Sequence, residues 1–498
     1  MTTTESRSAK LTASRIVFLV VAAAAPIAAM VGLAPLQYAM GNGAGTPATY
    51  VIAGAVLLCF GVGYAAMSRH ITNTGGFYTF ITRGLSRIAG VPSALVAVIA
   101  YSAVGLQLAG GFGYFVSNAI EQFTGISTPW FLWTVAGALA AGVLSYRSVD
   151  LSAKVLGVLM ALEIGVLMII DVVIVGHKGV HALPEASFHP HVVFGAGFSV
   201  SILIAFSTFI GFESAALYGE ESRTPARTVP RAVYASLLVI MVFYTLTSWI
   251  GVGAAGADNI GSIAGQELGN YFPGLAVQYI GNWFSDAMTV LICTSLFASL
   301  LAILNASSRY LYSLGREQVL PQPLGRLHPR FGSPARAAVV VTAINVVVPA
   351  LFYAARQDPY LTLVASMTGL GAVGIIALQA TAAAAVIGYF LWHPAGHWWK
   401  TFAAPAIGLL GLITAEVLVV KNFSLLTGTH SAVINNLPWL YVIGIVAGLA
   451  YAWWLRSNRP GVYTALASDD HVRSDAGPID LDTDEVSGTP EVAPQPEG

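Results

Sequence analysis

Charged residues are scarce in this sequence: they make up 9% of the chain, whereas 56% of the residues are hydrophobic. Soluble domains carry about 25% charged residues, so this chain has too few charges to cover a surface exposed to water. Its 498 residues leave room for roughly a dozen helices at about 20 apolar residues per membrane span. The composition excludes an ordinary soluble protein, and we predict one all-α integral membrane domain in a lipid bilayer.

Cysteine is almost absent, and the apolar segments contain no histidine. The two cysteines, Cys59 and Cys293, lie inside apolar segments, which excludes a disulfide framework and a cysteine metal site. Four histidines share one predicted outer loop, where their irregular spacing favours solvated side chains over a metal site: His177, His181, His189 and His191. A membrane-embedded enzyme is therefore disfavoured, and we expect no cofactor and no metal. A channel is also disfavoured, because no repeated filter sequence is visible.

Twelve apolar runs, bounded by polar residues or by proline and glycine, are typical of transmembrane helices. The predicted spans are 15–42, 48–68, 92–118, 129–146, 151–176, 194–218, 231–254, 280–313, 335–354, 361–392, 401–420 and 437–456. Several are long enough to be tilted or to extend beyond the bilayer. Residues 70–91 are predicted to form a partly helical re-entrant or interfacial segment.

Lysine and arginine are distributed unequally between the connecting segments. With the N-terminus inside the cell, the inner segments carry nineteen of them, and the outer segments carry only Lys178, Arg356 and Lys421. Inner loops of membrane proteins are enriched in these residues. We therefore predict a multi-pass protein of the cytoplasmic membrane with both termini in the cytoplasm, which requires an even number of spans.

The two ends of the chain are predicted to lie outside the membrane domain. Residues 1–14 form a short cytoplasmic segment, and the apolar run after them is too long for a signal peptide, so it is interpreted as a retained helix. The membrane domain is predicted to cover residues 15–456. Nine of the 24 acidic residues follow Arg459, in a stretch rich in proline, glycine and serine. Such a composition buries too little apolar surface to fold, so residues 457–498 are predicted to be a disordered acidic cytoplasmic tail.

Helix-breaking residues interrupt the first and sixth spans. The first contains Pro26 and Gly32, and the sixth contains Ser207 and Gly211. Proline removes a backbone donor and clashes with the preceding turn, and non-helical backbone at membrane depth persists only where protein or a watery cavity satisfies it. Paired interruptions in two halves are typical of inverted-repeat transporters with the site at the breaks. A simple kink at Pro26 in a packed helix is the alternative.

Three segments resemble motifs of the amino acid–polyamine–organocation permeases. Residues Phe209 to Val233 read FIGFESAALYGEESRTPARTVPRAV, which is similar to the sixth-span signature of that superfamily. Asn73–Tyr78 with Arg83–Leu85 resembles the segment after the second span, and Asn305–Arg309 with Gly315–Pro321 resembles the motif after the eighth. The segments occur in the expected order, so the chain resembles a bacterial amino acid permease of this superfamily.

The resemblance implies twelve transmembrane helices, with a five-plus-five inverted-repeat (LeuT-like) core and two additional helices. It implies a secondary active transporter that moves an amino acid or a closely related small amine by alternating access. An exchanger of amino acids, amines or polyamines is the alternative. Many members carry Gly-Ser-Gly at the first break, where this chain has Ala28 to Gly32, so the identity of the cargo stays open.

The two breaks are predicted to bind a zwitterion through the backbone. At the first break the free amides of Ala29, Met30 and Val31 would face a substrate carboxylate, as at a helix N-terminus. The carbonyl groups predicted to receive an ammonium group are those of Pro26, Ile27, Phe206 and Ser207. In similar permeases an aromatic ring closes this site from outside, and Phe206 or Phe209 is the candidate; packing in the core or against lipid is the alternative. The complete predicted substrate-binding set is Pro26, Ile27, Ala29, Met30, Val31, Gly32, Phe206, Ser207, Phe209, Gly211 and Tyr101.

Two acidic residues in the spans are candidates for the coupling ion. Glu163 lies about 16 Å into the fifth span at 1.5 Å per residue, where many similar permeases have a lysine in a sodium-like site. It is predicted to carry a coupling proton, and the alternatives are a sodium ligand or a structural group. Glu213 is a candidate for the inner gate or for a contact with backbone of the first span. The expected partners are the small solute, a proton or sodium, and the bilayer, with no nucleic acid.

Three further acidic residues lie in or near the spans. Asp171 and Asp286 are placed towards the outer ends of the fifth and eighth spans, where they are expected to line a watery vestibule. Glu416 in the eleventh span lies outside the predicted ten-helix core and is given no role.

Overall fold

The computed structural model describes residues 16–18, 20–21, 24–71, 76–147, 149, 153–213, 225–427, 429 and 431–467. The described residues form helices and turns, with no strand among them. The chain divides into two units, Met1–Ala467 and Ser468–Gly498. The second unit and the predicted N-terminal segment 1–14 lie outside the described residues, so the helices and contacts all belong to the first unit.

Nine helices in the described part of the chain are long and apolar enough to span a bilayer. They are α4 (Thr46–Met67), α6 (Arg87–Thr124), α8 (Ala153–Lys178), α12 (Pro225–Ala255), α15 (Asn282–Arg316), α16 (Ala335–Ala354), α17 (Ala365–Trp392), α18 (Ala404–Lys421) and α21 (Trp439–Asn458). Shorter apolar helices are α2 (Pro26–Met30), α3 (Ala34–Met40), α7 (Trp130–Tyr146) and α10 (Phe198–Thr208). Each of these helices coincides with a predicted span, or with part of one.

Helices outside the predicted spans connect the long ones. The predicted interfacial segment contains α5 (Gly76–Gly84). The remaining short helices are η1 (Gly43–Gly45), η2 (Gly179–Ala182), η3 (Glu185–Phe188), α9 (Pro190–Val193), α13 (Ile260–Glu267), η4 (Leu268–Asn270), α14 (Tyr271–Tyr279), η5 (Gln322–Gly325), η6 (Pro359–Val364), η7 (Trp399–Ala403), α19 (Phe423–Thr427), α20 (Ala432–Asn435) and α22 (Pro460–Ala465).

The longest helix, α6, shows how local sequence sets the helix ends. The Ser86 side chain accepts a hydrogen bond from the Ala89 amide, which satisfies one free donor of the first turn. The helix ends at Gly125, whose φ of 71° is left-handed, as is common for a glycine after a helix C-terminus. Its 38 residues extend about 57 Å at 1.5 Å per residue. Because a bilayer core is about 30 Å thick, α6 must tilt strongly or project from the membrane.

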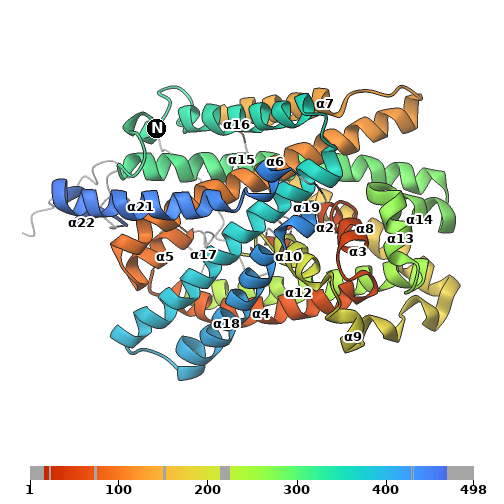
Figure 1. Ribbon diagram of the computed structural model, residues 1–498, viewed down its shortest axis with the longest axis horizontal. Coiled ribbons are helices and arrows are strands. Elements are labelled where there is room, and N and C mark those ends of the chain that lie inside the picture. The colour runs from red at the N-terminus through yellow and green to blue at the C-terminus, as the bar shows by residue number, and fades with distance from the viewer. Residues whose placement is uncertain are drawn as a thin grey trace, which may run out of the picture. The chain divides into compact units, whose positions relative to one another are not determined.

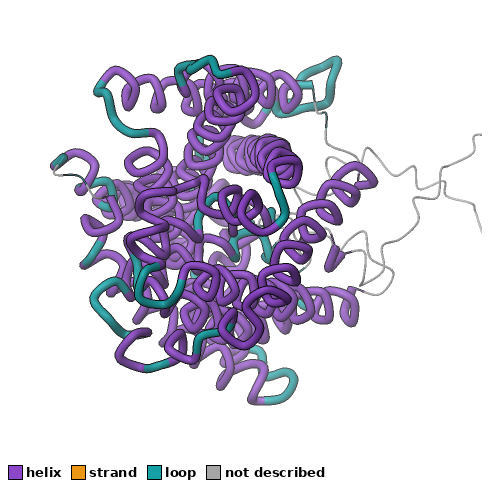
Figure 2. Tube along the Cα trace, turned by 90° about the vertical axis from the view of Figure 1, so that its right-hand side faces the viewer, coloured by secondary structure: helices purple, strands orange, loops and turns teal. Residues whose placement is uncertain are grey.

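The long helices pack as two groups, one around α4 and one around α6, and the two groups are joined by the packing of α17 against α18. In the α4 group, α4 packs against α12 and α18; in the α6 group, α6 packs against α7, α15, α17 and α21, and α16 packs against α7 and α15. In Figure 1 the interrupted helices α2, α3 and α10 lie between these two groups, and Figure 2 shows, in a view turned by 90°, that loops lie among the helices. Helix α2 contacts α8, α12 and α15, and α10 contacts α3, α4, α17 and α18. The packing thus brings the two predicted breaks into the middle of the unit.

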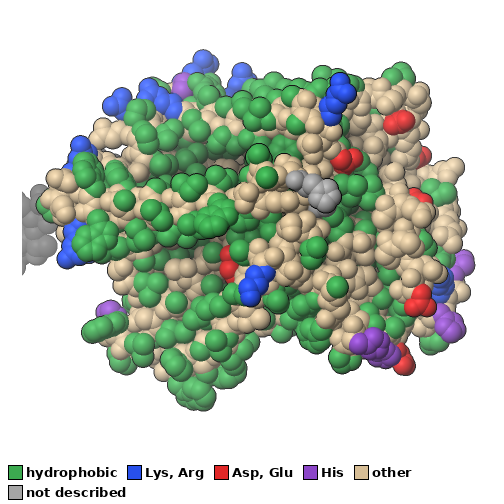
Figure 3. Space-filling model, viewed as in Figure 1, with side chains coloured by type: hydrophobic (Ala, Val, Ile, Leu, Met, Phe, Trp, Pro, Cys, Tyr) green, Lys and Arg blue, Asp and Glu red, His purple; other side chains and the backbone are tan. Residues whose placement is uncertain are grey.

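The charged side chains are segregated along the helices. In Figure 3, most visible lysine and arginine side chains lie at the end where α21 and α22 are found, and most visible acidic side chains lie towards the opposite end. Large apolar side chains are exposed along the helices in between, including Val172, Leu410 and Ile443. This distribution suits a protein whose middle faces lipid.

The end of the described chain is anchored to α5 and to the end of α15. The Arg83 guanidinium donates two hydrogen bonds, of 2.9 and 3.1 Å, to the Ala467 carbonyl oxygen. The Glu317 carboxylate accepts hydrogen bonds from the Ala467 amide, at 3.3 Å, and from the Tyr78 hydroxyl, at 2.5 Å. Burial and the adjacent Glu317 raise the pKa of Tyr78 well above its usual value, so this hydroxyl stays protonated. We refer to Tyr78, Arg83, Glu317 and Ala467 as the C-terminal anchor.

The anchor corrects the predicted start of the tail. Residues 457–467 were expected to be disordered with the rest, but α22 begins at Pro460 and the packed unit extends to Ala467. Leu466 and Ala467 are each 3% exposed, in a cluster that includes Val91 and Leu314. The reason is local: this part of the tail carries apolar side chains that the acidic remainder lacks.

Candidate functional site

The first break lies immediately before Pro26. Ala25 has a φ of 47° and a ψ of 71°, so the chain leaves the helical conformation there and a new helix, α2, begins at Pro26. For a residue with a side chain the left-handed conformation costs about 1–2 kcal/mol. Proline suits the first position of a helix, because its φ is already helical and it lacks only an amide that would have no partner.

The second break follows α10, which ends at Thr208. Residues 209–213 form turns, and Gly211 has a φ of 112°, a conformation that side chains disfavour. The helix therefore ends within the predicted range Phe206–Gly211. The continuation of this span, 214–224, lies outside the described residues.

Tyr244 of α12 bridges the two breaks. Its hydroxyl donates a hydrogen bond of 3.1 Å to the carbonyl oxygen of Ala24, at the first break. Its ring lies edge-on to Phe209 at the second, with 6.1 Å between the ring centroids. The side chain is fully buried. Tyr244 was not predicted from the sequence, and its only signal there is a hydroxyl in an apolar span, which requires a partner.

Two further side chains bond to backbone carbonyl groups of the interrupted spans, one of them next to a break. The Tyr360 hydroxyl donates to the Gly32 carbonyl oxygen at 2.9 Å, just after α2. The Gln37 side-chain amide donates to the Ser201 carbonyl oxygen at 3.0 Å, which joins α3 to α10. Non-helical backbone at this depth requires such partners, and here the protein supplies them.

Glu163 of α8 lies at the first break. Its Oε2 atom is 3.4 Å from the Ile27 amide nitrogen, which donates to it, and the residue is 5% exposed. The Ser295 hydroxyl on α15 lies beside the same carboxylate but outside hydrogen-bonding geometry. A carboxylate at the start of α2 faces the partly positive end of that helix. The geometry places Glu163 at the predicted binding region; its role as a coupling group stays a prediction.

The amides predicted to meet the substrate carboxylate are not all free in this structure. The Ala29 amide donates to the Ala25 carbonyl oxygen at 3.0 Å, and the Val31 amide donates to that of Ile27 at 2.8 Å. Met30 is the last residue of α2. The amide directed out of the helix start is that of Ile27, earlier in the chain than expected.

The three aromatic residues at the second break are buried inside the protein. Phe206 is 3% exposed, and Phe209 and Phe212 are fully buried, which excludes the lipid-facing alternative for them. Phe212 packs edge-on against Phe60 at 6.1 Å between centroids. Their packing suits both a core role and the predicted gate. The adjacent Ser207 hydroxyl is bonded to the Ile204 carbonyl oxygen of its own helix.

Glu213 holds the turn of the second break. Its Oε2 atom accepts a hydrogen bond of 2.9 Å from the Gly211 amide, and its Oε1 atom accepts one of 3.4 Å from the Tyr101 hydroxyl. Tyr64 of α4 donates to the Glu213 carbonyl oxygen at 3.2 Å. The structure thus brings the predicted residues Tyr101, Gly211 and Glu213 together. These contacts join the break to α4 and α6.

Most described residues at the two breaks are buried, although Gly211 at the second break is partly exposed. Pro26, Ile27, Met30 and Glu163 are buried, as is Phe209. These five side chains have almost no surface open to solvent, so a solute that contacts them requires their neighbours to move. Sequestration of this kind is a usual property of sites that open and close in turn.

The other intramembrane acids have their own surroundings. Asp171 is 8% exposed and accepts a hydrogen bond of 2.7 Å from Thr247, so it is packed between α8 and α12 rather than lining the expected vestibule. Asp286 is partly exposed and bonded to Gln122 at 2.7 Å. One carboxylate oxygen of Glu416 is buried without a hydrogen-bond partner among the described residues.

Metal-binding clusters and disulfides were not expected. Within the described ranges, no group of three or more histidine, cysteine or acidic side chains is arranged to hold a metal. Cys59 on α4 and Cys293 on α15 are free thiols.

The long apolar helices of the described residues define a multi-pass α-helical membrane protein. Comparison with known proteins then gives the family: a sequence profile of the amino acid permease family matches residues 11–448, so the chain belongs to that family. Its members are permeases, not enzymes.

Curated relatives include branched-chain amino acid permeases. The chain is 25% identical to BcaP of Lactococcus lactis over 336 residues, 62% of this chain and 69% of the relative. It is 25% identical to BcaP of Bacillus subtilis over 320 residues, 59% of this chain and 64% of the relative. A methylthioribose transporter of Bacillus subtilis is 23% identical over 321 residues, 60% of this chain and 65% of that protein.

Proposed function

We propose that this permease is a secondary active transporter that moves an amino acid across the cytoplasmic membrane by alternating access, coupled to a proton. The observation that carries the proposal is the pair of largely buried breaks. They are bridged by Tyr244, and Glu163 faces the first amide of α2. Exchange of amino acids, amines or polyamines is the second candidate.

The helix pattern supports a five-plus-five inverted-repeat core. The nine long and three shorter apolar stretches fall in the twelve predicted spans, with interruptions in the first and the sixth. On this layout α18 and α21 are the additional helices. The lysine and arginine side chains at the end near α22 support cytoplasmic termini.

The breaks provide a site for a zwitterion built from backbone groups. The start of α2 carries the partial positive charge of a helix N-terminus, which suits a substrate carboxylate. The end of α10, at Phe206 and Ser207, carries partly negative carbonyl groups, which suit an ammonium group. Each of these carbonyl oxygens already accepts one turn amide and has a second lone pair for a ligand. The proposed substrate-binding set remains Pro26, Ile27, Ala29, Met30, Val31, Gly32, Tyr101, Phe206, Ser207, Phe209 and Gly211.

The apolar side chains around the breaks favour an apolar amino acid as the cargo. Phe206 and Phe209 present rings there, and Met30 and Ile27 are buried at the first break. The two relatives named for branched-chain amino acids support the same class. The relative named for methylthioribose shows that related permeases also take other solutes.

Glu163 explains how a proton would be coupled to the solute. In the ionised form its carboxylate accepts a hydrogen bond from the Ile27 amide. The same amide is the group best placed to bind a substrate carboxylate. Two carboxylates at one helix start repel each other. Protonation of Glu163 removes its charge and weakens its hold on the amide, so binding of the proton and of the solute favour each other. Glu213, already bonded to Gly211 and Tyr101, is proposed to hold the inner gate.

The test is uptake into proteoliposomes under an imposed pH gradient. Glu163→Gln keeps the shape of the side chain but cannot take up a proton at this position, so gradient-driven accumulation should be lost while exchange of labelled for unlabelled solute continues. Glu416→Gln, the same change on α18, is the matched control and should accumulate solute like the unmodified protein. Unchanged accumulation by Glu163→Gln would contradict the coupling role of Glu163. Accumulation that depends on a sodium gradient instead of a pH gradient would show that sodium, not a proton, is the coupling ion. Saturation and counterflow separate a carrier from a channel.

A further inference from the structure

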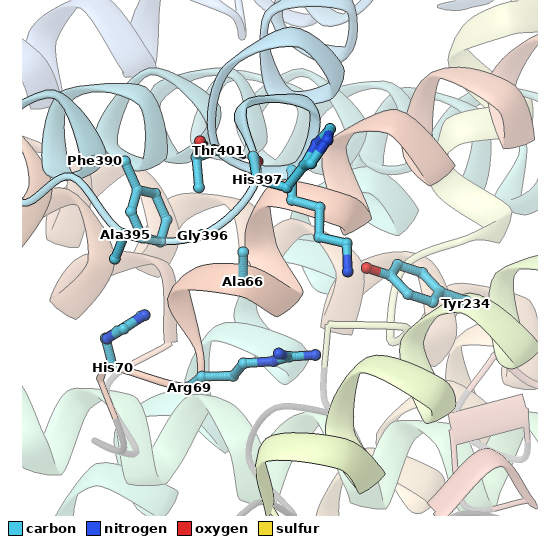
Figure 4. Close-up of a pocket in the computed structure, with 10 residues that line it drawn as sticks. Ala66, Arg69, His70, Tyr234, Phe390, Ala395, Gly396, His397 and Thr401 are labelled. Atoms are coloured by element: carbon cyan, nitrogen blue, oxygen red, sulfur yellow. Dashed lines mark hydrogen bonds between the residues drawn. The ribbon is translucent and has the colours of Figure 1, made fainter.

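A cavity of about 80 Å³ lies away from the two breaks, at the end of α4 and beside the connection between α17 and α18. Its polar lining comes from three regions of the sequence: Arg69, His70, Tyr234, His397, Lys400 and Thr401. In Figure 4, Arg69 and His70 lie on one side and His397 and Thr401 on the other, with Tyr234 between the two sides. We refer to it as the basic cavity. None of the described residues that line it is acidic.

The side chains of the basic cavity are suited to a phosphate group. Arg69 supplies a planar set of N–H donors and Lys400 an ammonium group, and the hydroxyl groups of Thr401 and Tyr234 can also donate. Arginine and lysine are the usual ligands of phosphate, and such charged hydrogen bonds are the stronger ones. The volume exceeds the ~30 Å³ that one water takes up in the liquid. It is far below the ~300 Å³ at which pockets for larger organic ligands begin.

The surroundings of the basic cavity indicate that the phosphate belongs to a lipid. The connection that forms one wall exposes Trp392, Trp398, Trp399 and Phe402, with exposed fractions of 84, 65, 45 and 50%. Aromatic side chains of this kind gather where a bilayer meets water, at the level of the headgroups. Helix α18, which begins directly after the cavity, has exposed apolar side chains such as Ile407 and Leu410 along its length. The acyl chains of a lipid bound at the cavity could lie along these side chains.

We propose that the basic cavity binds the phosphate of an anionic phospholipid from the adjacent leaflet. The headgroup would connect the end of α4, through Arg69, and α12, through Tyr234, with η7, through Lys400. Basic pockets between transmembrane helices are established as sites for acidic headgroups. Such a lipid would add a further link between α4, α12 and the segment that leads into α18, the first additional helix of the proposed layout.

The test compares lipids on the full-length protein in detergent. Binding of phosphatidylglycerol and of zwitterionic phosphatidylcholine is measured by native mass spectrometry, and the unfolding temperature is followed with each lipid and with inorganic phosphate. Each cation near a membrane surface is worth about fivefold in affinity, so Arg69→Gln with Lys400→Gln should bind phosphatidylglycerol about 25-fold more weakly. Arg356→Gln with Lys421→Gln removes two cations that do not line the cavity and should bind it normally.

Two outcomes would overturn the proposal. Equal binding of phosphatidylcholine and phosphatidylglycerol would show that the negative headgroup is not recognised. Stabilisation by inorganic phosphate with no further gain from lipid would assign the site to a free anion. Where the double variant does not fold, Lys400→Arg and Lys400→Gln are compared instead; the first retains the charge and should retain binding, and equal losses in both would also contradict the proposal.

Discussion

At the scale of single residues, buried hydroxyl groups hold the unwound backbone in place. Tyr244, Tyr360 and Tyr64 each donate to a carbonyl oxygen next to one of the breaks. A buried carbonyl without a donor costs about 1–3 kcal/mol. These tyrosines therefore make it possible for the chain to leave the helix at membrane depth.

Tyr244→Phe tests this role. The change keeps the ring against Phe209 but leaves the Ala24 carbonyl oxygen without its donor, so unfolding should become easier by about 1–2 kcal/mol. Solute counterflow should also slow, because the position of the first break is less well defined. Thermal unfolding in detergent and counterflow in proteoliposomes measure the two effects. Tyr353→Phe, at a tyrosine that is 43% exposed, is the control. An equal change in unfolding and counterflow in the two variants would show that the contact of Tyr244 with both breaks has no special importance.

The breaks themselves could be predicted from the sequence, but their hydrogen bonds could be predicted only in part. Proline and glycine act locally, so the interruptions at Pro26 and Gly211 are visible in the sequence. The prediction of free amides at Ala29 and Val31 did not take into account that proline favours the first position of a helix. A helix that begins at Pro26 uses these amides in its own hydrogen bonds. The partner of Tyr244 could not be predicted, because Ala24 is 220 residues away in the chain.

At the scale of helices, the apolar runs of the sequence were enough to predict where most of the long helices lie. Hydropathy is a local property, and the long helices occupy the predicted ranges, with ends that differ by a few residues. The start of the tail was misplaced because an average composition over 457–498 concealed the short apolar stretch at α22. Leu466 there is buried, although most of the tail is acidic.

The C-terminal anchor gives a prediction at this scale. Arg83→Gln removes the charged group that donates twice to the Ala467 carbonyl oxygen, and hydrogen bonds to charged groups contribute about 1.5–3 kcal/mol each. The unfolding temperature should fall, and protease should cut more readily near α22, while the affinity for solute stays the same. Arg87→Gln, at an exposed arginine at the start of α6, is the matched control. An unchanged cleavage rate near α22 in Arg83→Gln would argue against the anchor.

At the scale of the whole molecule, the chain belongs to the amino acid permease family, and we expect its cargo to be an apolar amino acid. A ligand that binds only the native state stabilises it by about 2.7 kcal/mol at a concentration of 100 times its Kd. We therefore expect leucine, isoleucine or valine to raise the unfolding temperature of the purified protein, and a polyamine such as spermidine to leave it unchanged. A shift with spermidine alone would favour the exchanger of amines over the amino acid transporter.

The inverted repeats remain a prediction at the same scale. The sequence places one break in the first span of each half, and in the structure Tyr244 contacts both breaks. The second half of the sixth span lies outside the described residues, so the symmetry of the two breaks rests on α2 and α10 alone.

The positions of the two native thiols have a practical consequence. Cys59 belongs to α4 and Cys293 to α15, so there is one thiol in each helix group, and both are partly accessible. The sequence contains no other cysteine. A pair of spectroscopic labels on the unmodified protein would therefore report the distance between the two groups. A change in that distance when solute is added would show that α4 and α15 move relative to one another, without the introduction of a single new residue.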